Sequence, residues 1–268
     1  MGPAVASEAY GAFAYAYDKA LGERFFRAAR RLLDETLERF PTPKRTHLDL
    51  ACGTGLALET FCARGWRSIG IDASLAMLQV AHARVPRVAA GDLRALPLRS
   101  KFARITCMYD SLNHMLDAND LIAAFRSVRA LMSDDSLFLF DMNHPDIYPE
   151  VWGISDPFIA RGKDYYLEIA TSYRSREKTG RANVTGWAEL GGKRVPIREQ
   201  HRQRAYTERE IVKALDEAGM TPADVIDFDP YGEADSIEAR TVKLFFVCAP
   251  KLERRALSPS NPRSNPTG

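Results

Sequence analysis

Two glycines that follow a short apolar stretch give the clearest chemical signal in the chain. The run from His47 to Leu56 predicts an apolar strand, a glycine-rich turn and the start of a helix. Gly53 and Gly55 would let the backbone pass close to a ligand, and Asp49, just before the turn, could pair with a cationic group of that ligand. A dinucleotide site would have a third glycine where this chain has Leu58, which argues against NAD.

A second carboxylate, Asp72, ends the next apolar stretch at Gly70-Ile71-Asp72. It lies about 20 residues after the turn, where it could accept hydrogen bonds from both hydroxyls of a ribose. Together the two signals predict a ribose-containing ligand at the ends of two strands.

Strands that alternate with helices must position these residues, because short apolar runs and helical periodicity follow each other along the chain. The expected strands cover residues 47–51, 68–71, 87–89, 105–109, 137–140, 225–228 and 242–248. The expected helices cover residues 25–40, 56–63, 75–83, 121–132 and 208 to about 218, the last opened by a capping box of Thr207 and Glu210. This pattern predicts βαβ units around a parallel sheet.

Period-two segments replace this pattern between residues 157 and 206, with turn signals at 178–180 and 191–192, and they predict an antiparallel insertion. We divide the chain into a helical cap (1–45), a Rossmann-like cofactor-binding core (46–156), an antiparallel substrate lid (157–206), the end of the core sheet (207–250) and a tail (251–268). The tail is rich in Ser, Pro, Asn and Arg, so we expect it to be disordered.

Composition excludes several classes of protein. A chain of 268 residues with 46% hydrophobic and 27% charged residues suits one large globular domain. The net charge of +2 gives no basic field for nucleic acid or an anionic membrane, which favours a small-molecule partner. The four cysteines show neither zinc-ligand spacing nor a disulfide framework, and no apolar stretch is long enough to cross a membrane. We therefore expect a cytoplasmic protein without a metal site.

Five motifs extend the signal of the glycine-rich turn along the chain. They are Asp49-Leu-Ala-Cys-Gly-Thr-Gly55, Gly70-Ile-Asp72, Ser74-Leu-Ala-Met77, Gly91-Asp92-Leu93 and Ala95-Leu-Pro-Leu98. With these motifs in this order the chain resembles the class I S-adenosylmethionine-dependent methyltransferases, from about Tyr10 to Pro250. The resemblance implies a doubly wound, Rossmann-like α/β sheet of seven strands with the last strand antiparallel, an inserted antiparallel β lid, and S-adenosyl-L-methionine as the cofactor.

The resemblance also assigns cofactor contacts by position. Asp49, Gly53 and Gly55 would meet the methionine part, Asp72 the ribose, and Met77, Asp92 and Leu93 the adenine, while Ala51, Ala73 and Tyr109 complete the predicted set. Each position also has a structural interpretation. The glycines could form only a tight turn, Asp72 could cap the next helix, Met77 could fill the core and Asp92 could serve as a turn residue.

Methyl transfer from a sulfonium is an in-line displacement, so the protein must mainly align the acceptor and exclude water. The run Tyr109 to His114 follows an expected strand at the ligand crevice, which makes His114 a candidate base and Asn113 a candidate acceptor contact. His144 has a similar place after the next strand. Tyr17 lies in a segment similar to the Y-x-x-x-Y-D with which small-molecule methyltransferases cover the cofactor, and its ring could contact the sulfonium. Each of these side chains could instead have only a structural role.

The insertion resembles the antiparallel lid of glycine-, sarcosine- and amino-sugar N-methyltransferases. The run from Glu199 to Thr207 matches their E-x-H-x-x-R-x-Y-(T/S) pattern at the end of that lid. Trp187, His201 and Arg204 could therefore line an acceptor pocket, or they could form one face of an amphipathic sheet.

The predicted function is methyl transfer from S-adenosylmethionine to an N or O atom of a small molecule. Three alternatives stay open: an RNA-directed methyltransferase, an NAD-dependent oxidoreductase on the same sheet topology, and a methyltransferase-like scaffold without turnover. We expect a small-molecule acceptor as the partner, no membrane and no nucleic acid, with a homodimer as the assembly to test.

Overall fold

The computed structural model describes residues 11–154, 156–230 and 242–251. Within these ranges no helix is long and apolar enough to cross a membrane. The predicted disordered tail lies outside the described residues, apart from Lys251, and so does Tyr10.

A seven-stranded sheet forms the centre of the core, in the order β10-β11-β5-β4-β1-β2-β3. Its strands are β1 (Thr46–Leu50), β2 (Arg67–Asp72), β3 (Val88–Ala90), β4 (Phe102–Cys107), β5 (Met132–Asn143), β10 (Met220–Phe228) and β11 (Lys243–Pro250). β11 runs antiparallel to its neighbours β5 and β10, while the other neighbouring strands pair in parallel. The predicted doubly wound sheet with an antiparallel last strand is therefore confirmed.

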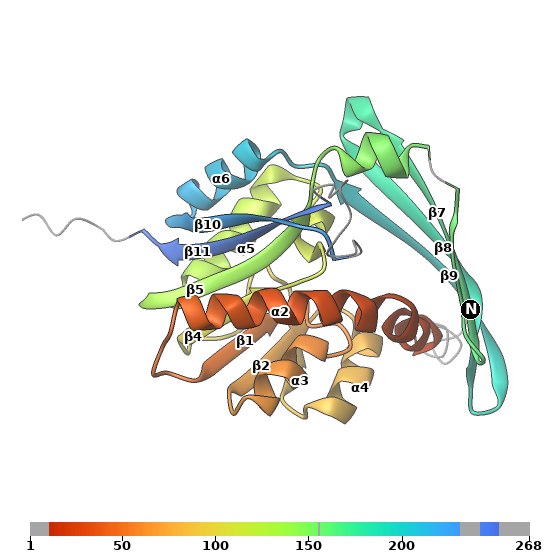
Figure 1. Ribbon diagram of the computed structural model, residues 1–268, viewed down its shortest axis with the longest axis horizontal. Helices are drawn as coiled ribbons and strands as arrows, with labels where there is room; N and C mark the ends of the chain where they lie inside the picture. The colour runs from red at the N-terminus through yellow and green to blue at the C-terminus, as the bar shows by residue number, and fades with distance from the viewer. Residues whose placement is uncertain (1–10, 155, 231–241, 252–268) are drawn as a thin grey trace, which may run out of the picture.

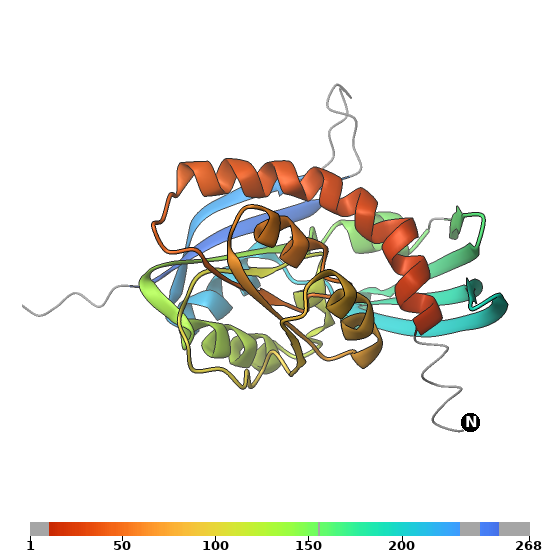
Figure 2. The same ribbon diagram turned by 90° about the horizontal axis from the view of Figure 1, so that it is seen from below.

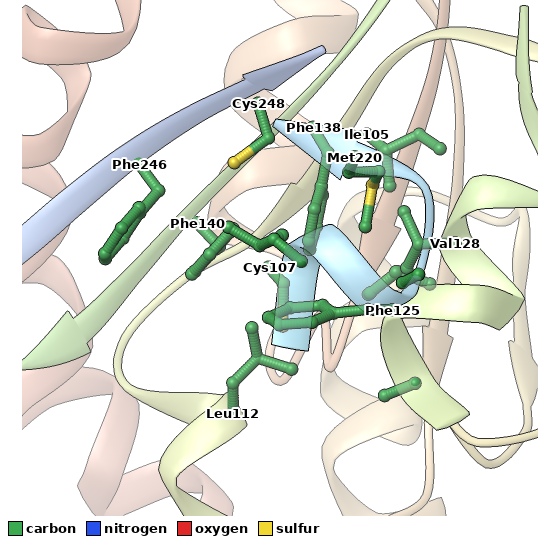
Figure 3. Close-up of a cluster of buried hydrophobic side chains, with 14 of the residues drawn as sticks. Ile105, Cys107, Leu112, Phe125, Val128, Phe138, Phe140, Met220, Phe246 and Cys248 are labelled. Atoms are coloured by element: carbon green, nitrogen blue, oxygen red, sulfur yellow. The ribbon is translucent and has the colours of Figure 1, made fainter. Parts of the chain in front are cut away.

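Helices cover both faces of this sheet, because parallel strands are apolar on both sides. α5 (Ala118–Arg129) and α6 (Glu208–Glu217) pack on one face, and α2 (Glu23–Arg39) and α3 (Leu56–Ala63) pack on the other (Figures 1 and 2). α4 (Leu75–Arg84) lies beside β2 and β3. The core beneath α5 holds Phe125, Phe138 and Phe140 (Figure 3). Each is fully buried and contributes about 1.5–3 kcal/mol through its apolar surface.

Several element boundaries differ from the prediction, among them that of β4, which was expected over 105–109 and is found at Phe102–Cys107. The helix expected over 121–132 begins at Ala118, because the Asp117 side chain accepts a hydrogen bond from the backbone N–H of Asn119 and caps the helix. Met132 belongs instead to β5, which begins five residues before the expected strand at Leu137. β10 likewise begins at Met220, directly after the positive φ of Gly219 ends α6.

The N-terminal part of the chain is one long helical segment with a widened turn. Residues 11–17 are helical, a π-helical turn covers Asp18–Gly22, and α2 continues from Glu23. α2 buries Phe25 and Ala29 against the core sheet, whereas Phe13 and neighbouring small residues pack on the lid. The segment therefore spans both sheets of the molecule (Figure 2).

The insertion forms a separate four-stranded antiparallel sheet beside the core (Figure 1). Its strands are β6 (Phe158–Arg161), β7 (Tyr165–Arg174), β8 (Thr179–Leu190) and β9 (Lys193–Arg204). The β7–β8 hairpin turns at Lys178 and the β8–β9 hairpin turns at Gly191 and Gly192, where φ is positive. Both turns lie where the sequence predicts them. The inward face carries Val184 and Ile197 against the N-terminal helix.

Candidate active site

A hollow opens where β1 and β4 end, with about 370 Å³ of empty space that is partly open to solvent. Its walls are formed by Tyr17, Gly22, Phe26, Asp49, Ala51, Cys52, Gly53, Thr54, Leu56, Met108, Tyr109 and Ser111. Five predicted site residues therefore meet at one hollow: Tyr17, Asp49, Ala51, Gly53 and Tyr109.

The glycine-rich turn has the backbone form that the sequence predicts. Gly53 and Gly55 have φ angles of 53° and 88°, where glycine is free of the Cβ penalty. A Cβ on Gly53 would meet no atom within 4 Å, so open space lies beside this residue. A Cβ on Gly55 would lie 3.2 Å from Ala81 of α4, so this glycine also permits close helix packing. The turn thus leaves room for a ligand at Gly53.

Asp72 holds this turn in place. Its carboxylate accepts hydrogen bonds from the backbone N–H of Gly53 at 2.8 Å and of Ser74 at 2.7 Å. Burial raises the pKa of Asp72, and these backbone hydrogen bonds partly oppose the rise. Each carboxylate oxygen has a second lone pair, so the structural role leaves capacity for ribose hydroxyls.

Asp49 brings a buried carboxyl group to the wall of the hollow. The Thr106 hydroxyl donates a hydrogen bond of 2.5 Å to its Oδ1 atom. Burial raises the pKa of Asp49 to about 7, against the lowering effect of the Thr106 hydrogen bond. Asp49 can therefore change its charge near neutral pH.

A buried ion pair joins the N-terminal helix to the glycine-rich turn. Arg84 Nη2 lies 2.5 Å from Asp18 Oδ2, and Arg84 Nη1 donates to the Thr54 carbonyl at 2.8 Å. The Thr54 hydroxyl donates to Asp18 Oδ1 at 2.5 Å. These contacts hold Tyr17, the neighbour of Asp18, over the hollow, where its ring meets the Tyr109 ring edge-on at 5.6 Å. No local pattern indicates the role of Arg84, which lies 66 residues after Asp18.

The residues predicted for the adenine and ribose side do not line this hollow. Met77 is half-buried and packs with Tyr17 and the lid, and Ala73 is exposed. Asp92 is exposed, and its hydrogen bonds from Arg94 lower the pKa of its carboxyl group. The Leu93 side chain is buried in the core, so of this residue only the backbone is left to meet a ligand.

A strained turn follows β4 and forms the floor of the hollow. Tyr109 and Asp110 have φ angles of 65° and 49°, which are uncommon for residues other than glycine. Asp141 stabilises this turn by accepting hydrogen bonds from both backbone N–H groups. Lys243, 2% exposed, donates to Asp110, to Asp141 at 2.9 Å and to Asn143 at 3.0 Å. The turn is thus held by a buried cation between two carboxylates.

The same network reaches the lid through Gln203 of β9. Its side-chain N–H donates to Asp110, and its Oε1 atom accepts from Asn143 at 2.9 Å and from the Tyr148 hydroxyl at 3.0 Å. The lid is therefore bonded directly to the turn that forms the floor of the hollow.

Two histidines face each other beside this network. The His114 ring lies 6.0 Å from the ring of His201, and its Nε2 atom lies 3.4 Å from Nε2 of Gln203. His114 is exposed to solvent, yet protein groups surround it closely enough that burial lowers its pKa, against the effect of Asp110. Burial also lowers the pKa of His201, with a further contribution from His114. His114 therefore has protein groups close around it, although part of the residue is open to solvent.

Four residues predicted for the acceptor side, Asn113, Trp187, Arg204 and His144, have other roles in the structure. Asn113 is fully buried, donates to the Arg204 carbonyl at 2.9 Å and accepts from the Asn143 backbone N–H at 3.0 Å, so its amide joins core and lid. Trp187 lies on the opposite face of β8 from the buried Val184 and Ala188, and the guanidinium of Arg194 lies 4.2 Å from the centre of its ring.

Arg204 also lies out of phase with His201, and its guanidinium pairs with Glu210 at 3.2 Å. His144 follows β5, where its backbone N–H donates to the Val242 carbonyl and its ring lies 3.6 Å from the Asp146 carboxylate. It does not line the hollow. Of the predicted acceptor-side residues, the structure therefore brings together His114 and His201.

Comparisons with known proteins agree with this arrangement. Residues 48–135 match the model of a methyltransferase domain. The chain is 25% identical to a putative methyltransferase of a Geobacillus species, over 89% of this chain and 98% of that one. It is 27% identical to the dTDP-3-amino-3,6-dideoxy-alpha-D-glucopyranose N,N-dimethyltransferase of Streptomyces fradiae, over 83% and 87% of the two chains.

Among solved structures, an S-adenosylmethionine-dependent methyltransferase from Clostridium acetobutylicum superposes with a TM-score of 0.75 at 24% identity, covering 88% of this chain and 97% of that one. The fold is therefore shared along nearly the whole chain. The predicted methyltransferase class is confirmed by the domain match and these relatives. The shared fold is that of an S-adenosylmethionine-dependent methyltransferase.

Proposed function

We propose that this S-adenosylmethionine-dependent methyltransferase, which acts on an N or O atom of a small molecule, methylates an amine nitrogen with His114 as the base. The observation that carries the proposal is the position of His114, an exposed residue just after the turn that follows β4, whose ring lies beside Gln203 and His201 of the lid. An acceptor held between the lid and this turn would lie beside the His114 ring.

The residues of this chain divide the work of methyl transfer. The cofactor, when bound, supplies an electrophilic methyl group. Asp49 and the glycine-rich turn would hold its methionine part, Asp72 its ribose, and Met77 its adenine. Tyr17 lines the hollow and would help to exclude water when the cofactor is bound, which favours displacement by the acceptor over side reactions.

An amine that is protonated in water must lose a proton before its lone pair can attack. His114 is suited to accept this proton, because burial lowers its pKa and keeps the ring neutral at physiological pH. His201 would stay neutral for the same reason, so neither histidine would repel the ammonium form of the acceptor. The similar protein of Streptomyces fradiae is an amino-sugar N,N-dimethyltransferase, and this similarity supports an amine acceptor.

The test is formation of S-adenosylhomocysteine with a panel of amino sugars, simple amines and matching alcohols. We expect turnover with amines and none with alcohols that differ only in the reacting atom. His114→Ala should lower kcat by about 10²–10⁴-fold and change the affinity for S-adenosylhomocysteine less than about threefold. His82→Ala, on the exposed side of α4, is the matched control and should keep full turnover. Full turnover of His114→Ala would exclude His114 as the base, and a preference for alcohols would exclude the amine.

Further expectations from the sequence stay part of this proposal. The four cysteines are free thiols, which supports a location in the cytoplasm. A small-molecule acceptor also leaves no role for nucleic acid, and the homodimer can be tested by light scattering. Thermal unfolding with S-adenosylhomocysteine, NAD(H) and RNA separates the rival functions, because only a ligand of the native state raises the midpoint.

A further inference from the structure

A row of buried polar side chains crosses the core sheet beneath the cofactor hollow. It consists of Ser68 on β2, His47 and Asp49 on β1, and Thr106 on β4, each 2% exposed or less. The strand register pairs His47 with Ser68 and Asp49 with Thr106. Buried polar groups cost free energy unless they are hydrogen-bonded, so a row of four requires a complete set of partners.

While Asp49 is a carboxylate, the hydrogen bonds in this row run in one direction. The Thr106 hydroxyl gives its single hydrogen to Asp49 Oδ1 at 2.5 Å, so it must accept from His47 Nε2 at 2.9 Å. The proton of the neutral ring is then on Nε2, and Nδ1 accepts from the Ser68 hydroxyl at 3.1 Å. Burial lowers the pKa of His47 to about 3, which keeps the ring neutral.

The His47 ring is fixed from both sides. It stacks on the Phe61 ring of α3 at 3.6 Å with an interplanar angle of 10°, and its two nitrogens are bonded to different strands. The ring position is therefore fixed, and with Asp49 ionised the Nε2–H of His47 donates to Thr106 while the Thr106 hydroxyl donates to Asp49. In this state the geometry places a donor at the carboxylate that lines the hollow.

We propose that Thr106, oriented by His47, is a positioning residue that holds Asp49 as a carboxylate facing the cofactor, so that cofactor affinity depends on pH through Asp49. This inference rests on the proposed placing of the methionine part of the cofactor against Asp49. It goes further in assigning a role to His47, Thr106 and Ser68.

Opposing effects on Asp49 make its charge sensitive to the Thr106 hydrogen bond. Burial is the largest effect and favours the neutral acid, and the charge of Asp72 on β2 adds to it. The Thr106 hydrogen bond favours the carboxylate. With the pKa at about 7, neither form dominates at neutral pH.

Two titratable neighbours of Asp49 are the thiols of Cys52 and Cys107, which stay neutral in this range because burial raises their pKa values. The charged side chains at this end of the sheet are Asp72 and two paired sets, Asp18 with Arg84 and Asp110 and Asp141 with Lys243. Asp49 and Asp72 are thus the carboxyl groups here that have no basic side chain paired with them in the described residues.

The sign of the pH effect follows from linkage. The cationic ligand binds the carboxylate form of Asp49, so binding at a pH below about 7 must release the proton that the acid carries. Affinity therefore rises with pH, by up to about tenfold per pH unit, and levels off above the pKa of Asp49.

The experiment is calorimetric titration of the full chain with S-adenosylhomocysteine between about pH 5.5 and pH 7.5, in buffers of different ionisation enthalpy that report proton release. Thr106→Val removes the hydroxyl but keeps the shape, and should raise the midpoint by about one pH unit and weaken binding about fivefold at pH 7. Thr106→Ser keeps the hydroxyl and should match the parent protein. Asp49→Asn should make the affinity independent of pH.

His47→Phe provides a second, independent variant. It keeps the stack on Phe61 but removes the donor to Thr106, and should move the midpoint in the same direction by a smaller amount. Identical pH profiles for the parent protein, Thr106→Val and His47→Phe would overturn the inference, as would an equal shift in Thr106→Ser. If Thr106→Val does not fold, His47→Phe decides by the same criterion. Loss of all binding to the parent protein would contradict the proposed function, whereas binding without pH dependence would contradict only this inference.

Discussion

Lys243 gives the most demanding test of how this site is held together. Its ammonium group is 2% exposed and donates to Asp110, Asp141 and Asn143, so Lys243→Met would remove the cation and leave two carboxylates without it. Methionine has a similar length and is apolar, so the variant tests charge rather than volume. The turn with positive φ at Tyr109 would lose part of its support.

Removing one partner of a buried ion pair typically costs about 3–5 kcal/mol, because the remaining charge is left without compensation. This is a large part of the 5–15 kcal/mol of a typical domain. At about 2–4 °C per kcal/mol for a chain of this size, the unfolding midpoint should fall by roughly 6–20 °C. Lys213→Met is the matched control, since Lys213 is 78% exposed and should change the stability by less than about 0.5 kcal/mol.

The loss should also depend on pH. Burial raises the pKa of Asp141, and Lys243 lowers it, so the variant raises it further. Between the unfolded and folded pKa values the native variant binds more protons than the unfolded chain, so its stability falls as pH rises through this window. The deficit of Lys243→Met should therefore be larger at pH 8 than at pH 5.

Urea unfolding of both variants at these two pH values provides the measurement. A loss below about 1 kcal/mol would refute the view that Lys243 compensates two buried carboxylates. A large loss that is the same at both pH values would show that packing, not charge, is responsible.

Two further predictions test the cofactor side and the lid. Asp72→Ala leaves the backbone N–H groups of Gly53 and Ser74 unpaired and should weaken S-adenosylhomocysteine binding at least about tenfold, or 1.4 kcal/mol; unchanged affinity by calorimetry would remove Asp72 from the site. Thr207→Ala removes the capping box with Glu210 and should lower the stability by about 1 kcal/mol in urea unfolding, with cofactor affinity unchanged. A change in affinity would mean that the junction between β9 of the lid and α6 influences the cofactor site.

Much of the core could be predicted because its signals are local. α3 has the bounds expected from the sequence, since a glycine with positive φ precedes Leu56 and the chain turns again after Ala63. The capping box of Thr207 and Glu210 is present as expected. Glycines, caps and periodicity act over a few residues, so they can be interpreted without knowledge of the rest of the fold.

The sequence also encodes which residues of the lid face inward, because apolar residues on each strand recur every two positions on that face. Val195 and Ile197 face inward on β9, and a strand repeats every two residues, so His201 shares that face and Arg204 does not. On β8 the same argument from Val184 places Trp187 on the opposite face. The apolar residues of each strand therefore distinguish a possible acceptor contact from a surface residue.

The network around Lys243 could not be predicted in this way. Asp110 lies 133 residues from Lys243 and 93 residues from Gln203, and Asp141 lies 102 residues from Lys243. No spacing connects such residues, because Asp110 follows β4 whereas Asp141, Gln203 and Lys243 lie on β5, β9 and β11. Only the arrangement of these strands in the two sheets brings them together. The same is true of Arg84 and Asp18.

The π-helical turn at Asp18–Gly22 has a consequence for insertions and deletions. A π turn contains one residue more than an α-helical turn, and each residue of an α-helix rotates the chain by about 100°. Deleting the exposed Lys19 would allow ordinary α-helical winding and would rotate residues 11–17 relative to α2. Phe13 would then turn away from the lid while Phe25 stayed on the core sheet. The number of residues between these two contacts is therefore constrained, and scanning by substitution alone would not reveal this constraint.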